Sequence, residues 1–135
     1  MNYEKRITVP RNTPATAPVE ETLTVHPGVV TEVNIVFPDG CIQLVHAQIM
    51  HWSQNLWPPY ADMDFTGNNE VIDWNEEYAI QDPPFDFVVR AWNDDDTFAH
   101  TLTVRMAVLP RDTAASGGVL KAFTDFFGAL AKGEL

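Results

Sequence analysis

Acidic residues gather in three short stretches of the sequence, and their spacing decides which chemistry they could perform. Three consecutive aspartates occupy residues 94–96, and "ADMD" (61–64) and "DWNEE" (73–77) are also acidic. Calcium prefers several hard oxygen ligands that converge on one point. Consecutive aspartates point in different directions, so a bound ion would require two of these stretches to meet. The residues of such a calcium site would be Asp62, Asp64, Asp94 and Asp96.

A turn is the competing interpretation of residues 93–100, which read "NDDDTFAH". Asn and Asp tolerate turn conformations and hydrogen-bond to nearby backbone groups. Apolar residues alternate with their neighbours on both sides of this stretch, as in a β-hairpin. The alternating sets are Phe85, Phe87, Val89 and Ala91 before it, and Leu102, Val104, Met106 and Val108 after it. We therefore expect it to reverse the chain between strands at 85–93 and 99–109, and we predict neither a metal ion nor a cofactor.

The other groups that catalyse reactions in proteins do not form a recognisable set here. His46 and His51 are five positions apart in a strand-like segment, so they face opposite sides, whereas zinc needs three or four converging ligands. Neither serine lies in a G-x-S-x-G elbow. The lone cysteine, Cys41, precedes an apolar strand, as is typical of a small buried hydrophobe. The sequence therefore predicts a protein that is not an enzyme.

The charge of the chain restricts its partners. The 135 residues include 19 acidic and 8 basic side chains, for a formal net charge of -11. This charge opposes binding to nucleic-acid phosphates and to anionic lipid surfaces, so we expect neither as a partner. It suits a soluble protein or one that docks on a basic surface. The polar start, residues 1–12, lacks the apolar core of a signal peptide, so we expect synthesis in the cytoplasm.

Short alternating segments between residues 22 and 110 predict the fold. Turn signals rich in Pro, Gly and Asp separate them, and no helical pattern alternates with them. Seven or eight such strands predict an all-β antiparallel sandwich, jelly-roll-like. Strict alternation within 29–37 would place Val29, Thr31, Val33, Ile35 and Phe37 on one face. The expected strands are 22–26, 29–37, 42–52, 70–74, 77–80, 85–93 and 99–109.

Two segments flank this predicted sandwich of residues 22–110. Residues 1–21 combine a strand-like start with a Pro-rich stretch, which predicts an extended arm or, equally, a surface loop. Residues 111–135 contain a small-residue linker and then apolar side chains at helical spacing over 119–132. A helix this short needs a surface to cover it. That surface could be one end of its own sandwich or a neighbouring subunit. We expect a neighbouring subunit, contacted through Phe123, Phe126, Phe127 and Leu130.

Aromatic residues in "HWSQNLWPPY" (51–60) form another candidate binding surface, made of Trp52, Trp57 and Tyr60. Exposed Trp and Tyr on a sandwich loop are typical of a platform that stacks sugars or anchors a protein partner. In the competing interpretation Trp52 and Trp92 cap the core and Trp57 folds its own loop down, because tryptophan is highly buried on average. The platform supports an alternative function, a carbohydrate-binding β-sandwich module whose acidic loops would hold calcium.

Three segments of the sequence resemble small phage-associated structural proteins. They are "HPGVVTEVNIVFPDGC" (26–41), "LWPPYADMDFTGNN" (56–69) and "RAWNDDDTFAHTLTVRMAVLP" (90–110). The resemblance covers residues 3 to 110. It implies a β-sandwich with an extended N-terminal arm and a variable tail, no catalytic residues, and assembly into homo-oligomers. Our leading hypothesis is therefore a structural protein of a virion that decorates a capsid or serves as a tail accessory. Its partners would be copies of itself and the larger assembly.

Overall fold

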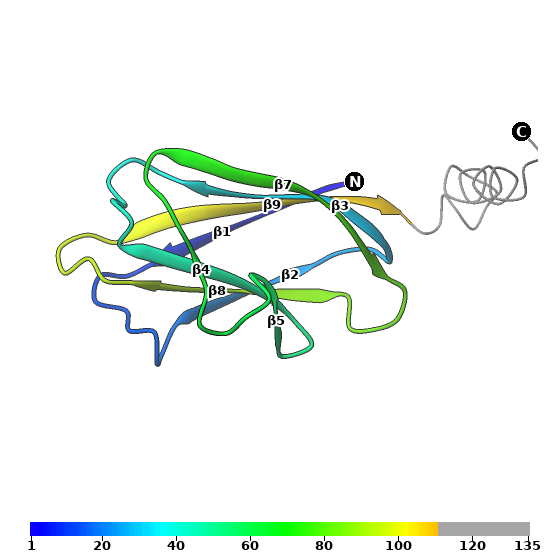
Figure 1. Ribbon diagram of the computed structural model, residues 1–135, viewed down its shortest axis with the longest axis horizontal. Helices are drawn as coiled ribbons and strands as arrows, with labels where there is room; N and C mark the ends of the chain where they lie inside the picture. The colour runs from blue at the N-terminus through cyan, green and yellow to red at the C-terminus, as the bar shows by residue number, and fades with distance from the viewer. Residues whose placement is uncertain (111–135) are drawn as a thin grey trace, which may run out of the picture.

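The computed structural model describes residues 1–110, which form two antiparallel sheets packed face to face (Figure 1). Sheet A has the strand order β1-β9-β3-β7, and sheet B has the order β2-β8-β4-β5 with β6 paired to β4. The predicted all-β sandwich is therefore confirmed. The strands are β1 (Asn2–Val9), β2 (Val19–Thr24), β3 (Gly28–Phe37), β4 (Val45–His51), β5 (Gln54–Trp57), β6 (Phe65–Thr66), β7 (Glu70–Ile80), β8 (Asp86–Asn93) and β9 (His100–Pro110).

The strand pairings are nested. β1 pairs with β9, β2 with β8, β3 with β7 and β4 with β5. In addition β9 pairs with β3, β8 with β4, and the two-residue β6 with β4. Most connections therefore cross from one sheet to the other. No helix among these residues is long and apolar enough to span a membrane. The helix expected at 119–132 lies outside the described residues.

The connection between β8 and β9 corrects one prediction. It is not a hairpin, because β8 belongs to sheet B and β9 to sheet A. Residues 94–99 instead carry the chain across the gap between the sheets. Alternating apolar residues correctly identified both strands and their buried faces. Alternation shows which residues of a strand face the core. It does not show which strand lies beside it in the sheet.

The Pro-rich stretch expected as an arm or a surface loop crosses one end of the sandwich. β2 begins at Val19, within the expected arm, and pairs with β8. Before it, Thr13 is buried and forms an isolated bridge with Asn93. The Asn12 N–H also donates to the Asp95 carbonyl at 2.9 Å. These contacts hold the segment against the body of the protein, so it does not extend away as an arm.

A bulge in β3 explains where simple alternation fails. The register of β3 against both β7 and β9 shifts between Val30 and Glu32. A bulge changes which side chains point inward on its two sides. Val30 is therefore buried and Thr31 is exposed, contrary to the prediction, and Val29 is only half-buried. Beyond the bulge, the predicted positions Val33, Ile35 and Phe37 are all buried.

Two more strands differ from their expected limits. The expected strands 70–74 and 77–80 are one continuous strand, β7, at the edge of sheet A. β4 begins at Val45 rather than at residue 42, because residues 42 and 43 have positive φ angles and form a turn. The core face of β4 carries Val45, Ala47, Ile49 and His51.

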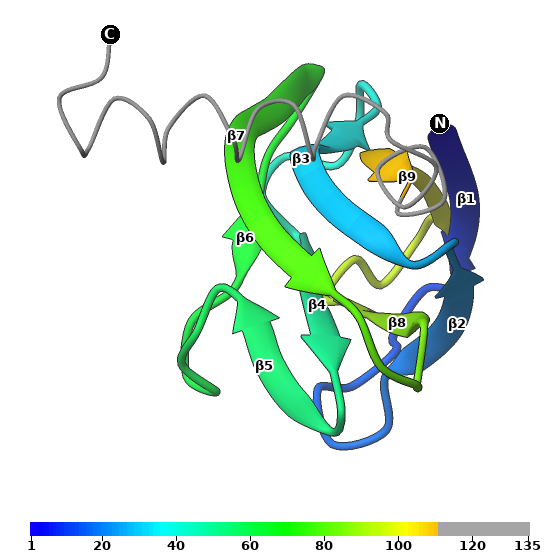
Figure 2. The same cartoon turned by 90° about the vertical axis from the view of Figure 1, so that its right-hand side faces the viewer.

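Aromatic side chains fill the flank of the sandwich where β7 and β5 lie opposite each other (Figure 2). Trp57 stacks on Phe87 with ring centroids 5.7 Å apart. Its other neighbours are Trp74 at 6.0 Å and Tyr78 at 5.8 Å, both at steep angles. Such edge-to-face and offset contacts add stabilisation beyond the burial of apolar area. They join the edge strand β7 to sheet B.

Replacing Phe87 by alanine should strongly destabilise the fold. Phe87 is fully buried and contacts Trp57, Tyr78 and His51, so its removal opens a cavity that costs about 3–5 kcal/mol. Val88, the next residue, faces outward, and Val88→Ala should cost less than about 1 kcal/mol. Urea unfolding followed by tryptophan fluorescence measures both. Equal losses for the two variants would contradict this assignment of the inner face.

Candidate functional site

Three loops meet at one end of the sandwich, which we call the loop end (left in Figure 1). They are residues 10–18, 38–44 and 94–99, which follow β1, β3 and β8. The opposite end, which we call the turn end, contains the β4–β5 turn at 52–53 and the β7–β8 loop at 81–85. The aspartate run therefore lies at the loop end, where chain segments from both sheets come together.

The middle aspartate of the run, Asp95, is buried and hydrogen-bonded within its own loop and to β9. Its Oδ1 accepts hydrogen bonds from the N–H groups of Thr97 at 2.8 Å and Phe98 at 3.2 Å. Its Oδ2 lies 2.8 Å from Nε2 of His100. The hydrogen bond from His100, and then that from the Thr97 N–H, lower the pKa of the Asp95 carboxyl below its usual value. Asp95 is therefore ionised at neutral pH and orders its own loop.

Asn93 connects this loop to the strands. Its side chain is almost fully buried, and its amide donates to the carbonyls of Val9 at 3.2 Å and Phe98 at 3.0 Å. Its Oδ1 accepts from the Asp95 N–H at 2.9 Å, and its backbone N–H donates to the Thr13 carbonyl. One side chain therefore satisfies backbone groups of β1 and of the β8–β9 loop.

His46 on β4 lies between two aspartates from different loops. Nδ1 is 2.7 Å from Oδ1 of Asp64, and Nε2 is 2.7 Å from Oδ2 of Asp94. The ring also stacks on Trp92, its cross-strand partner, with centroids 5.2 Å apart and planes 6° apart. Both ring nitrogens lie at hydrogen-bond distance from a carboxylate, so this one ring links the two loops.

The two acidic loops that were candidates for a calcium site do meet, but a histidine lies between them. Asp64 and Asp94 both direct an oxygen at His46. Asp62 and Asp96 are exposed, and Asp96 accepts a hydrogen bond from the Thr97 hydroxyl. Within residues 1–110, no group of three or more His, Cys, Asp or Glu side chains is arranged to hold a metal ion.

Sequence reasoning missed the role of His46. The residue is 18 positions from Asp64 and 48 from Asp94, so no local motif connects the three. Finding this set would have required knowing that β4 pairs with β8 and that the β5–β6 loop folds back over β4.

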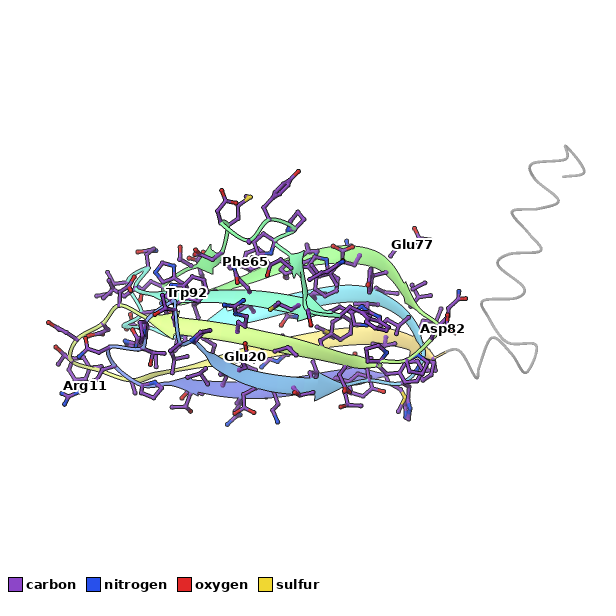
Figure 3. The ribbon with its side chains drawn as sticks, turned by 90° about the horizontal axis from the view of Figure 1, so that it is seen from below. Arg11, Glu20, Phe65, Glu77, Asp82 and Trp92 are labelled. Atoms are coloured by element: carbon purple, nitrogen blue, oxygen red, sulfur yellow. The ribbon has the colours of Figure 1, made fainter. Side chains whose placement is uncertain are left out.

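Loop 58–64 is fixed on the outer face of β4 by His46 and Gln48. The Gln48 amide is buried and donates to the carbonyls of Ala61 at 3.1 Å and Met63 at 2.7 Å. Figure 3 shows this loop rising from the sandwich beside the labelled Phe65. Its exposed side chains include Tyr60, which has 65% of its surface accessible.

The three residues of the predicted aromatic platform do not share one surface. Trp57 belongs to the core and is 7% exposed, whereas the competing interpretation expected Trp52 and Trp92 to cap the core. Trp52 is 64% exposed in the β4–β5 turn, whereas Tyr60 is on loop 58–64. Two separate exposed aromatic residues remain as binding candidates. The expected assembly contacts Phe123, Phe126, Phe127 and Leu130 lie outside the described residues.

Cys41 is fully buried at the loop end, as expected for a small hydrophobe. Burial raises the pKa of its thiol, and the charges of Asp39 and Asp95 raise it further. The thiol therefore stays protonated at neutral pH, which disfavours nucleophilic chemistry.

The described side chains of the loop end form an ordered network, in which carboxylates hydrogen-bond to histidines and to backbone N–H groups. No family model matches the chain, and no curated protein matches it. Its function must therefore be inferred from the geometry of its own surfaces.

Replacing Asp95 by asparagine should destabilise the protein in a pH-dependent manner. The pKa of Asp95 is lower in the folded than in the unfolded state, so its ionised form stabilises the fold above the unfolded value of about 4. This contribution disappears as the pH falls through the folded value. We therefore expect Asp95→Asn to be less stable than the wild type at pH 7, with the difference shrinking toward pH 3.

Urea unfolding at pH 7, 5 and 3 measures this effect. Asp96→Asn is the matched control, because Asp96 is exposed and its neighbour in sequence. A difference between Asp95→Asn and the wild type that stays constant with pH would show that the charge of Asp95 is unimportant.

Replacing His46 by alanine should release loop 58–64. Without the imidazole ring, Asp64 and Asp94 lose their common partner, and the hydrogen bonds of Gln48 are left to hold the loop. Chymotrypsin should then cleave after Tyr60 several times faster, while the unfolding midpoint changes little. His26→Ala provides a control, because His26 is exposed at the turn end. If cleavage after Tyr60 is equally slow in both variants, His46 does not hold the loop.

Proposed function

We propose that this chain is a non-enzymatic structural subunit that associates with copies of itself and decorates a larger assembly, namely a phage virion. The nested pairing of first with last strands supports a jelly roll, an architecture found in viral capsid and lectin domains. Because a fold hosts many functions, the proposal must be supported by the surface. Its main support is the rigid presentation of apolar side chains at the loop end.

Ile42 is the first of these side chains. It is 63% exposed and has a φ angle of 47°, in the left-handed region that β-branched residues rarely adopt. This conformation costs about 1–2 kcal/mol. It persists because Oδ1 of Asn68 accepts the N–H groups of Gly40 at 2.9 Å and Ile42 at 3.0 Å. A strained, exposed and firmly held apolar residue is typical of a recognition surface.

Phe98 is the second apolar side chain at the loop end and is 64% exposed. Its N–H donates to Asp95 and its carbonyl accepts from Asn93, so the backbone behind the ring is fixed. Aromatic anchors on rigid loops lose little conformational entropy on binding. Ile42 and Phe98 are therefore suited to contact another protein.

The distribution of charge supports a role for the tail. Residues 1–110 contain 16 of the 19 acidic and five of the eight basic residues, so they carry the entire formal net charge of -11. Copies of the sandwich therefore repel one another at low ionic strength. The segment 111–135 is formally neutral and carries the apolar positions Phe123, Phe126, Phe127 and Leu130. It is suited to join subunits without adding repulsion.

Sedimentation velocity tests this proposal. We expect the full chain to form an oligomer and a variant that lacks residues 112–135 to be a monomer, because the apolar tail positions are removed. Ile42→Ser combined with Phe98→Ser should also weaken assembly. Met63→Ser is the matched control, because Met63 is 50% exposed but lies on loop 58–64. A monomeric full chain, or an unchanged mass in both the deletion and the double variant, would exclude self-association through these surfaces.

A further inference from the structure

The turn end presents a tryptophan from an unfavourable backbone position. Trp52 and Ser53 have φ angles of 62° and 65°, so both central residues of the β4–β5 turn are left-handed, as in a type I′ turn. Asn and Gly are favoured at such positions, and a bulky residue is an outlier. The Trp52 side chain is nevertheless 64% exposed, so it gains little from burial. Strain of this kind, at a side chain that is mostly exposed, points to function.

A shallow depression of about 340 Å³ lies beside the indole ring of Trp52. Its size is at the lower end of the range for small-molecule sites, about 300–1,000 Å³. The polar side chains around it are those of His51, Tyr78, Gln81 and Asp82. The depression therefore combines one flat aromatic surface with amide, carboxylate and hydroxyl groups.

The floor of this depression is rigid. His51 is buried, with Nδ1 2.7 Å from the Tyr78 hydroxyl and Nε2 3.0 Å from the Pro84 carbonyl. The carbonyl can only accept, so Nε2 carries a proton and donates to it, while Nδ1 hydrogen-bonds to the Tyr78 hydroxyl. His51 also packs on Phe87 at 5.2 Å, and Trp52 meets His51 edge-on at 6.5 Å. The core thus fixes the surface next to the indole, which lowers the entropic cost of binding.

We propose that this depression binds a neutral carbohydrate, with the C–H face of a pyranose ring on Trp52 and its hydroxyls hydrogen-bonded to Asp82. An indole offers an apolar face for such a ring, and a carboxylate suits its hydroxyls. The carboxylate of Asp82 and the net charge of the chain disfavour sulfated, sialylated or phosphorylated ligands. The shallow shape and polar border disfavour a lipid chain.

This inference goes beyond the proposed structural function and uses a different surface. Ile42 precedes β4 and Phe98 follows β8, both at the loop end, whereas Trp52 follows the other end of β4 and lies beside the end of β7. A subunit attached through its loop end would therefore keep its sugar-binding end free.

The test titrates the full-length protein with neutral gluco-, manno- and galacto-configured oligosaccharides, by tryptophan fluorescence and calorimetry. We expect binding by the wild type and a loss of about tenfold or more in affinity for Trp52→Asn. Asparagine tolerates the left-handed turn, so this variant should unfold at the same or a higher temperature than the wild type. Its loss of binding would then not reflect a loss of fold. Asp82→Asn removes a carboxylate that would hydrogen-bond to the sugar, so it should also lower the affinity.

Tyr60→Ala is the matched control, because Tyr60 is as exposed as Trp52 but lies on loop 58–64. It should bind sugar like the wild type. The inference is overturned if no neutral oligosaccharide binds, if Trp52→Asn binds as tightly as the wild type, or if Tyr60→Ala removes binding. Trp52→Asn should sediment like the wild type. A negative sugar-binding result would therefore not count against the assembly proposal, which sedimentation of the loop-end and tail variants tests separately.

Discussion

The order of the loop end depends on one buried amide. Asn93 supplies hydrogen bonds to backbone groups of β1, of the Pro-rich loop and of the β8–β9 loop, at the point where the chain leaves sheet B for sheet A. Each buried backbone group left without a partner would cost about 1–3 kcal/mol. Asp95 extends this network to His100, the first residue of β9. The fixed positions of Phe98 and of the segment near Thr13 follow from these bonds.

Strand β4 relates this network to the other surfaces of the molecule. It lies inside sheet B, with its inward residues in the core and its outward residues His46 and Gln48 holding loop 58–64. A left-handed turn precedes it at Ile42 and another follows it at Trp52. The two strained turns are thus fixed to the ends of one buried strand. A rigid central strand allows each turn to display a bulky side chain without loosening the fold.

Properties that depend on single strands could be predicted from the sequence. Alternation identified β8 and β9 and their buried faces, because a half-buried strand imposes a period of two. The bulge near Val30 and the turn at Ile42 interrupt that period, and no local signal marks either of them. The partnership of His46 with Asp64 and Asp94 depends on strand pairing, which a single sequence does not encode locally. Trp52 precedes the four-residue strand β5 and Trp57 ends it, and the orientation of this strand decides which of the two side chains is buried.

The nested pairing also constrains how the chain can fold. β9 lies between β1 and β3 in sheet A, although nearly the whole sandwich separates it from β1 in sequence. Sheet A therefore cannot form until residues 100–110 have been synthesised, and before then β1 and β3 have unpaired edges. Contacts between residues so distant in sequence form slowly, since long loops must close first. During translation the partly made chain thus exposes edges that invite aggregation, and the high negative charge of the sandwich helps to keep such chains apart.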